Sequence, residues 1–335
     1  MKYIFVVLLM IFTFNGCSKN KQNENSVVIY VSEDRVFSEP ILKDFEKKTG
    51  IKVKALYDTE ESKSTGVVNK LIAEKNNPQA DVYWANEPIR AEILKQKGLL
   101  AKYISKNSKT IANNFKDKDG FWCGFSARAR VFVVDKSMKN YPKSVFDYLD
   151  KRFKDKAVIA NPLFGSTTAQ ISAIFVKFGD EKAKLFLNGL KKNGVKISTS
   201  NGESADFVVK KRYAFSLVDS DDAISRIREK KDIKMIYPDQ RDGEMGCFII
   251  PNVVMLIASS KHEQNAKLLI EYLLSDEVEA KLALADCAQI PLHEGVKPPH
   301  ELKALSDIKV MQVDYAKLAK KLHEIEVFLK EWAGY

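Results

Sequence analysis

Short apolar runs alternate with amphipathic stretches along most of the chain. The β-branched run "SVVIYVS" predicts a buried strand at 26–32, and "IKVKALYD" and "ADVYWANE" predict two further strands at 51–58 and 80–87. Each is followed by apolar residues at helical spacing; Gly50 can end the first of these helices and Pro88 can begin the third. This alternation predicts βαβ units, and therefore an α/β fold with a mostly parallel sheet. Ligands of such folds bind in loops at the carboxyl ends of the strands.

The middle of the chain repeats this order and predicts a second α/β lobe. A strand is predicted at 127–135 and a helix at 142–156, followed by three strand–loop–helix units. The apolar run 247–260 is broken by Pro251 and could return the chain to the first lobe. Two amphipathic helices are predicted in the remainder, at 264–284 and 315–335.

The N-terminal segment predicts export. A positive "MK" start precedes the 12-residue apolar run "YIFVVLLMIFTF", which is too short to span a bilayer and is typical of a cleaved secretory signal. The cysteine that follows "NG" resembles that of the bacterial lipobox, so residues 1–17 would be a lipoprotein signal with Cys17 lipidated. Residues 18–27 would form a flexible tether, and the protein would be lipid-anchored in the periplasm or cell envelope. Secretion without a lipid is the alternative.

Charge and cysteine content narrow the function classes. The formal net charge of +10 comes mostly from lysines scattered between acids, which predicts a solvated surface and no nucleic-acid partner. Cys123, Cys247 and Cys287 lack CxxC spacing and lie in apolar contexts, so we expect buried free thiols, with one disulfide as the alternative. The sequence contains no phosphate loop, dinucleotide fingerprint or nucleophile elbow, and its four histidines lack zinc spacing. These absences argue against an enzyme.

The segment "NPLFGSTTAQ" (161–170) predicts an anion site. Here glycine and hydroxyl residues follow a predicted strand and begin a predicted helix. The free backbone N–H groups at such a helix start can bind an anion, although one of the hydroxyls could simply cap the helix. "SNGES" repeats the arrangement, and "ARAR" adds two arginines on one strand face. The candidate donors are Ser166, Thr167, Thr168, Ser200, Asn201, Arg128 and Arg130.

The segment "LVDSDDAISR" (217–226) predicts a cation site. Asp219, Asp221 and Asp222 repel one another unless water, a cation or hydrogen-bond donors stabilise them. Asp219 or Asp221 could cap the following helix, but capping does not need three carboxylates. Acids also follow the strands of the first lobe and could face this cluster across a cleft, where a metal or an ammonium group would suit them: Glu33, Asp34, Asp58, Glu60 and Glu87.

The order of these segments resembles the substrate-binding proteins of bacterial ABC importers. The resemblance is carried by the lipoprotein signal, "VVIYVSEDRVFSEPILKDFEKKTGIKVKALYD", "ADVYWANE", "ARARV", "ANPLFGSTTA", "DSDDA", "YPDQ", "IPNVVMLI" and "AKLLIEYLLSDEVEAKLA". It covers nearly all of the mature chain and is most similar to the ferric-ion-binding branch, with its phosphonate- and sugar-phosphate-binding relatives.

The resemblance implies binding residues position by position. The first-loop ligand of the family falls at Glu33–Asp34, the acid after the third strand at Asn86–Glu87, and the tyrosine pair of the iron-binding members at Asp221–Asp222. Its anion positions correspond to Gly165, Ser166, Thr167, Asn201 and Arg128. If the ligand is a metal, the implied ligands are Asp34, Glu87, Asp221 and Asp222. Aspartates in place of both tyrosines depart from the iron-binding pattern.

The resemblance further implies a periplasmic-binding-protein type II fold with a hinge between two lobes. Residues 28–128 with about 252–300 would form lobe 1, 129–251 lobe 2, and 301–335 a C-terminal helical segment. The expected function is capture of ferric iron or a metal–anion complex by a monomer, and its delivery to an inner-membrane permease with its ATPase. No cofactor is required, since Fe(3+) with a synergistic anion would be cargo. Binding of a phosphonate, phosphate ester or other small organic anion by the same kind of importer is the alternative, and a metal-dependent hydrolase is a remote one.

Overall fold

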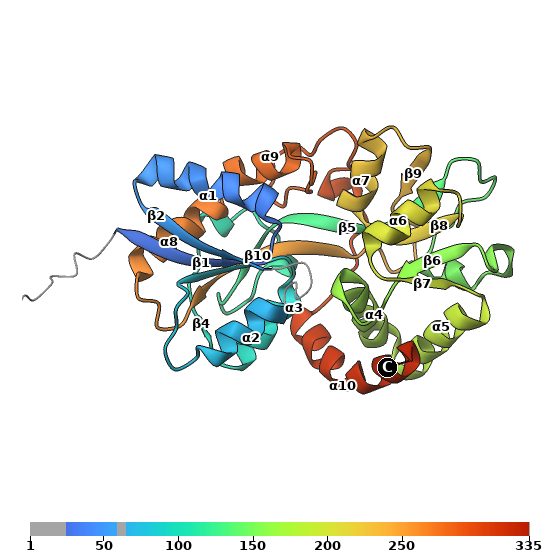
Figure 1. Cartoon of the computed structure of the whole chain (residues 1–335), viewed down its shortest axis with the longest axis horizontal. Helices are drawn as coiled ribbons and strands as arrows, with labels where there is room; N and C mark the ends of the chain where they lie inside the picture. The colour runs from blue at the N-terminus through green and yellow to red at the C-terminus, as the bar shows by residue number, and fades with distance from the viewer. Residues whose placement is uncertain (1–24, 59–64, 335) are drawn as a thin grey trace, which may run out of the picture.

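Two groups of strands meet at a pair of long antiparallel strands, Cys123–Asp135 (β5) and Ile249–Ile257 (β10), as Figure 1 shows. The computed structural model describes residues 25–58 and 65–334. The first group contains β1 (Ser26–Val31), β2 (Lys52–Tyr57), β3 (Val82–Ala85) and β4 (Leu100–Ala101). The second contains β6 (Ala157–Ala160), β7 (Lys196–Ser198), β8 (Phe215–Asp219) and β9 (Ile233–Ile236). The main path of the sheet is β2-β1-β3-β10-β5-β8-β6-β7, so β10 and β5 connect the two halves.

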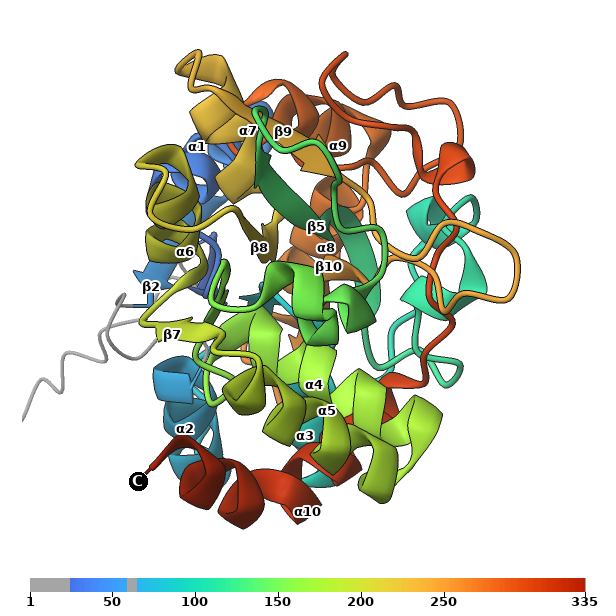
Figure 2. The same cartoon turned by 90° about the vertical axis from the view of Figure 1, so that its right-hand side faces the viewer.

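Helices cover both groups of strands. The first half carries α1 (Arg35–Thr49), α2 (Thr65–Ala73), α3 (Pro88–Gln96), α8 (Glu263–Leu273) and α9 (Asp276–Leu284). The second half carries α4 (Gly165–Phe178), α5 (Asp180–Lys192), α6 (Asn201–Val209) and α7 (Ser220–Arg228). The last helix, α10 (Tyr315–Ala333), packs against α3 of the first half and α4 of the second, along one edge of the molecule (Figure 2).

The predicted α/β arrangement is confirmed in both halves. β1 pairs in parallel with β2 and β3, and β6 pairs in parallel with β7 and β8, with helices in the connections. Parallel strands covered on both faces are apolar throughout. Tyr83 and Trp84 of β3, for example, are both fully buried and belong to separate apolar clusters. This packing fixes the strand ends, and with them the loops that carry the candidate site.

Some predicted elements differ in the structure. The single helix predicted at 264–284 is two helices, α8 and α9, since the Ser275 side chain accepts a hydrogen bond from the N–H of Val278 and starts a new helix. The helix predicted at 142–156 is instead two short 3₁₀ turns, Val145–Leu149 and Lys151–Phe153. Ser144 and Asp147 form a capping box that starts the first turn, and Asp150 accepts a hydrogen bond from the backbone N–H of Arg152 and starts the second. The prediction of one helix was wrong because side chain–backbone hydrogen bonds of Asp and Ser compete with a continuous helix.

The strand predicted at 127–135 begins earlier, at Cys123, because it pairs with strands of both halves. The predicted break at Pro251 is a change of register, between Pro251 and Asn252, within the continuous strand β10.

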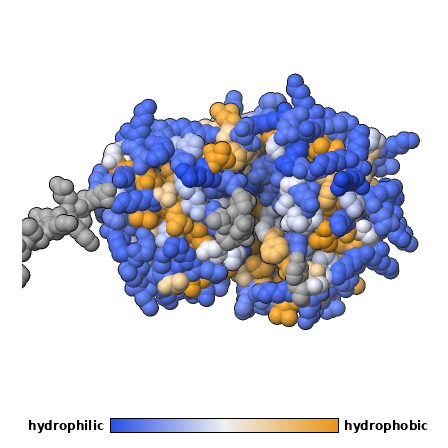
Figure 3. Space-filling model, viewed as in Figure 1, coloured by the Kyte–Doolittle hydropathy of each residue, from blue (hydrophilic) through white to orange (hydrophobic). Residues whose placement is uncertain are grey.

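The three cysteines outside the N-terminal segment are buried free thiols, as predicted. Burial raises the pKa of all three. Within residues 25–58 and 65–334, no helix has the length and apolar content needed to span a membrane. Figure 3 shows a largely hydrophilic face with small, separate apolar patches. The predicted signal segment with Cys17, and also Glu60, lie outside the described residues.

Candidate ligand-binding site

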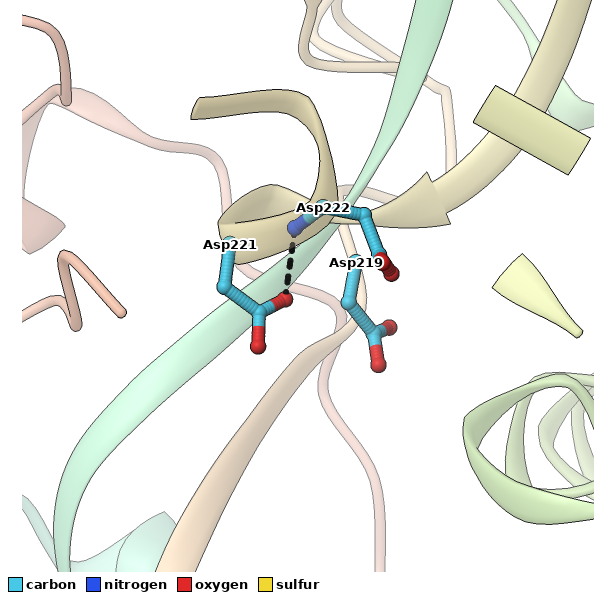
Figure 4. Close-up of side chains that lie close together, drawn as sticks. All are labelled: Asp219, Asp221 and Asp222. Atoms are coloured by element: carbon cyan, nitrogen blue, oxygen red, sulfur yellow. Dashed lines mark hydrogen bonds between the residues drawn. The ribbon is translucent and has the colours of Figure 1, made fainter. Parts of the chain in front are cut away.

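Three aspartates gather where β8 ends and α7 begins. Asp219 is the last residue of β8, and Asp221 and Asp222 lie in the first turn of α7. Each offers one carboxylate oxygen, and these three oxygens all lie within 4.8 Å of one another. Figure 4 shows the three side chains on neighbouring positions of the strand end and the helix start. We call these three residues the acidic cluster.

Asp219 stands at the N-cap position of α7, but its side chain does not cap the helix. Its Oδ1 accepts a hydrogen bond of 2.8 Å from Nη1 of Arg130, whose side chain is fully buried. Burial would raise the pKa of Asp219, but the guanidinium groups of Arg130 and Arg128 outweigh it, so the pKa lies below its usual value. The carboxylate of Asp219 therefore belongs to a buried ion pair and not to a helix cap.

Arg130 connects the end of β8 to the first turns of α4 and α6. Its Nη1 also donates to Ser166 Oγ at 2.9 Å and to Asn201 Oδ1 at 3.1 Å, and its Nη2 donates to Thr167 Oγ1 at 3.2 Å. Asn201 Nδ2 donates to Ser166 Oγ at 2.8 Å. A guanidinium can only donate, so Arg130 fixes these three oxygens as acceptors. We call Arg130, Ser166, Thr167 and Asn201 the arginine platform.

The first turn of α4 is not capped by a side chain. It begins at Gly165, which has a left-handed φ of 57°, and Phe164 occupies the cap position without a side-chain hydrogen bond. The N–H groups of such a turn are available to an anion. Ser200, in contrast, does cap α6, because its Oγ accepts a hydrogen bond of 3.1 Å from the N–H of Glu203. The Thr168 hydroxyl is buried without a hydrogen-bond partner in the described structure and does not join the arginine platform.

Arg128 connects the acidic loops of the two halves. Its Nη2 donates a hydrogen bond of 2.6 Å to the backbone oxygen of Asn86, which follows β3. Burial alone would lower the pKa of Arg128, but carboxylates from both sides raise it: Asp219 and Asp221 from the second half, Glu33 and Asp34 from the first. The predicted acids of the β1–α1 loop and two members of the acidic cluster therefore act on the charge of one guanidinium.

Two predicted acids have partners within the first half. Glu87 forms an ion pair with Arg90 at 2.9 Å between Oε1 and Nε, and burial raises the pKa of this carboxyl group. Asp58 Oδ2 accepts a hydrogen bond of 2.9 Å from Ser32 Oγ. Neither joins the acidic cluster, although the charges of Arg128 and Asp219 still act on Glu87.

The two half-buried members of the acidic cluster, Asp221 and Asp222, titrate differently from Asp219. Burial raises the pKa of Asp221 to about 6 and that of Asp222 well above its usual value, and neighbouring carboxylates add to both effects. Arg226, which the sequence analysis did not single out, lies 3.8 Å from Asp222 Oδ1 through its Nη1. The spacing of four residues between them on one helix was the available signal.

The chain matches a family model. The model is described as "Bacterial extracellular solute-binding protein" and matches residues 80–321, which include the arginine platform and the acidic cluster. The chain belongs to this family. As a solute-binding protein it is a component of transport and not an enzyme, which rules out the hydrolase alternative. The predicted family is thereby confirmed.

Curated relatives of this solute-binding protein carry two kinds of names. A "Putative 2-aminoethylphosphonate-binding periplasmic protein" of Salmonella typhi is 26% identical over 260 residues, 77% of this chain and 74% of the relative. An "Fe(3+)-binding periplasmic protein" of Serratia marcescens is 24% identical over 314 residues, 90% of this chain and 89% of the relative. Both relatives are periplasmic by name.

Solved structures share the fold over nearly the whole chain. The apo ferric ion-binding protein A of Pasteurella haemolytica has a TM-score of 0.81 at 25% identity, covering 92% of this chain and 98% of that one. Iron-bound HitA of Pseudomonas aeruginosa has a TM-score of 0.80 at 23% identity, with 91% and 99% covered. These likenesses confirm the predicted two-lobed periplasmic-binding-protein fold.

Proposed function

We propose that this solute-binding protein captures a small zwitterion that carries a phosphonate-type oxyanion and an ammonium group, for which 2-aminoethylphosphonate is the test ligand. The observation that carries the proposal is the ion pair between Arg130 and Asp219. This ion pair places the arginine platform next to the acidic cluster within one half of the molecule. A ligand with opposite charges a few bonds apart matches both groups of residues at once.

The oxyanion is proposed to bind at the first turn of α4. Hydrogen-bond donors available there are the N–H groups of the uncapped turn and the second Nδ2 hydrogen of Asn201. Arg128, two residues before Arg130 on β5, is proposed to add a second guanidinium. Arg130 itself is fully buried, so it contributes charge and holds Ser166 and Asn201 in place without touching the ligand. The ammonium group then lies toward the acidic cluster and the acids of the β1–α1 loop.

Capture of ferric iron as a metal–anion complex is the second candidate. The three carboxylate oxygens within 4.8 Å of one another favour it, because hard cations prefer such oxygens. Metal ligands would come from Asp34, Glu87, Asp221 and Asp222. Two tyrosines that could replace the family's phenolates are engaged elsewhere: Tyr30 donates to Glu74 at 2.9 Å, and Tyr213 packs against Phe207.

The family match also bears on the lobe boundaries, the membrane anchor and the transport partners. We infer that residues 28–128 with about 252–300 form one lobe and 129–251 the other, since β10 pairs with β3 on one side and β5 pairs with β8 on the other. The segment 301–335 contributes α10, which packs on both. The protein is proposed to act as a monomer, anchored in the cell envelope through a lipid on Cys17, and to deliver its solute to an ABC permease and its ATPase.

Calorimetric titration of the purified protein tests the ligand assignment. We expect 2-aminoethylphosphonate to bind with one site per chain. We expect ferric citrate to give no visible charge-transfer band, because Asp221 and Asp222 stand where the iron-binding pattern has its tyrosine pair. Heat of binding with ferric citrate, and no heat with 2-aminoethylphosphonate, would replace the first candidate with the second.

A further inference from the structure

The members of the acidic cluster differ in the partners that already engage them. Asp219 accepts a hydrogen bond from the buried Arg130 and is the least exposed of the three. A ligand cation that used this carboxylate would compete with a guanidinium that also holds Ser166, Thr167 and Asn201. Asp219 therefore neutralises Arg130 and holds the arginine platform in place.

Asp222 is engaged on its other side by α6. A Cβ atom built on Gly202, in the first turn of α6, would lie 3.5 Å from Asp222 Oδ1, so the carboxylate rests against that helix start. Arg226 lies 3.8 Å from the same oxygen and also donates to Asp206 Oδ1 at 3.0 Å and to the backbone oxygen of Gly202 at 3.3 Å. Asp222 and Arg226 together tie α7 to α6, the helix that carries Asn201.

Asp221 has no comparable partner. Its Oδ1 accepts a hydrogen bond of 3.0 Å from the N–H of Asp222, the bond that Figure 4 draws. Across residues 25–58 and 65–334, no Lys or Arg nitrogen lies within ion-pair distance of the Asp221 carboxylate, and Arg128 acts on it only from farther away. The charges of Glu33 and Asp34 from the opposite half act on Arg128 together with those of Asp219 and Asp221, and Glu33 and Asp221 both raise the pKa of the Cys287 thiol, which burial raises most.

We propose that Asp221 is the residue that selects for the cationic group of the ligand, while Asp219 and Asp222 position the site. This assignment rests on the proposed function and narrows it to a ligand with a single ammonium group, because a trivalent ion would have to draw two carboxylates away from guanidinium partners.

A pair of ligands that differ only in the amine tests the assignment. The parent protein is titrated with 2-aminoethylphosphonate and with ethylphosphonate at one neutral pH, and the ratio of the two affinities is the readout. In Asp221→Asn we expect the ratio to fall by about thirtyfold or more, as for truncation of one partner of a desolvated charge pair. In Asp222→Asn we expect both affinities to fall together, so that the ratio stays within about threefold of the parent's.

Two further variants keep the outcome decisive. Asp221→Glu retains the charge and should recover part of the preference for the amine, which a purely structural role would not predict. Asp232→Asn removes the exposed partner of Lys211 in the same half and serves as the control, with both affinities unchanged. A collapsed ratio in Asp222→Asn, or an unchanged ratio in Asp221→Asn, would overturn the assignment. Binding of ethylphosphonate as tightly as the amine by the parent would also overturn it, whereas a parent that binds neither ligand contradicts the proposed function itself.

Discussion

The buried ion pair between Arg130 and Asp219 can be tested by replacing Asp219 with asparagine. The side chain of Arg130 is 0% exposed and that of Asp219 is 10% exposed. Removing one partner of a buried pair leaves an uncompensated charge, and typically lowers the free energy of unfolding by about 3–5 kcal/mol. We therefore expect Asp219→Asn to be destabilised by this amount at neutral pH, as measured by urea denaturation followed through tryptophan fluorescence.

Asp206→Asn is the matched control for this experiment. It removes a carboxylate at 3.0 Å from Arg226 in the same half, but the two side chains are 20% and 46% exposed. Exposed ion pairs contribute about 0.2–1 kcal/mol, so the control should lose no more than that. The comparison separates the effect of burial from the loss of an arginine–aspartate contact as such.

The pH dependence supplies a second criterion. The pKa of Asp219 is lower in the folded protein than in the unfolded chain, so the ion pair stabilises the fold at pH values above the ordinary aspartate pKa of about 3.9. This contribution is lost as the pH falls through the folded-state pKa. The difference between parent and Asp219→Asn should therefore be full at neutral pH and should shrink in strong acid. A difference that is as large in strong acid, or equal stability at neutral pH, would refute the ion-pair account.

Three other predictions concern the hydroxyls, the ligand and the anchor. Thr167→Val should lower the free energy of unfolding by about 1 kcal/mol, because it removes an acceptor from Arg130, while Thr168→Val should be neutral or stabilising; chemical denaturation distinguishes them. Affinity for a cationic ligand should fall as the pH drops through about 6, because protonation of Asp221 removes the charge that binds it; calorimetry across this range would contradict us if affinity stayed constant. Cys17→Ala should move the protein from the membrane fraction to the soluble fraction of the envelope, and unchanged detergent partitioning would argue against a lipid anchor.

The sequence predicted the strands and helices that are buried and locally consistent. β1 and β3 are apolar runs that the structure buries, whereas β2 alternates lysines with apolar residues and is only partly buried; their helices follow at the expected spacing. The segment 142–156 was mispredicted because its apolar spacing fits a helix, whereas Ser144 and Asp150 divide it into two turns through hydrogen bonds that no periodicity reveals.

For the candidate site, the residue types could be predicted from the sequence, but the hydrogen-bond and ion-pair partners of each side chain could not. The spacing of Asp219, Asp221 and Asp222 at a strand end indicated a cluster. Which carboxylate is neutralised depends on Arg130, a contact between positions 89 residues apart in the sequence, and on the packing of α6 against α7. Long-range pairing of this kind is set by the sheet order, so a single sequence carries no local signal for it. Thr167 and Thr168 illustrate the same point, since adjacent hydroxyls of one motif have opposite surroundings.

The buried cysteines make the protein a convenient scaffold for an optical reporter. Thiolates, and not thiols, react with maleimide dyes, and burial raises the pKa of Cys123 to about 12 and that of the other two thiols as well. In a protein that lacks Cys17, a cysteine introduced at an exposed position would be the reactive thiol among the described residues. Val36→Cys is suited to this use: the side chain is 71% exposed in the first turn of α1, directly after the acids of the β1–α1 loop. We expect the fluorescence of a dye at this position to change when a solute binds beside the β1–α1 loop, and so to report ligand occupancy in real time.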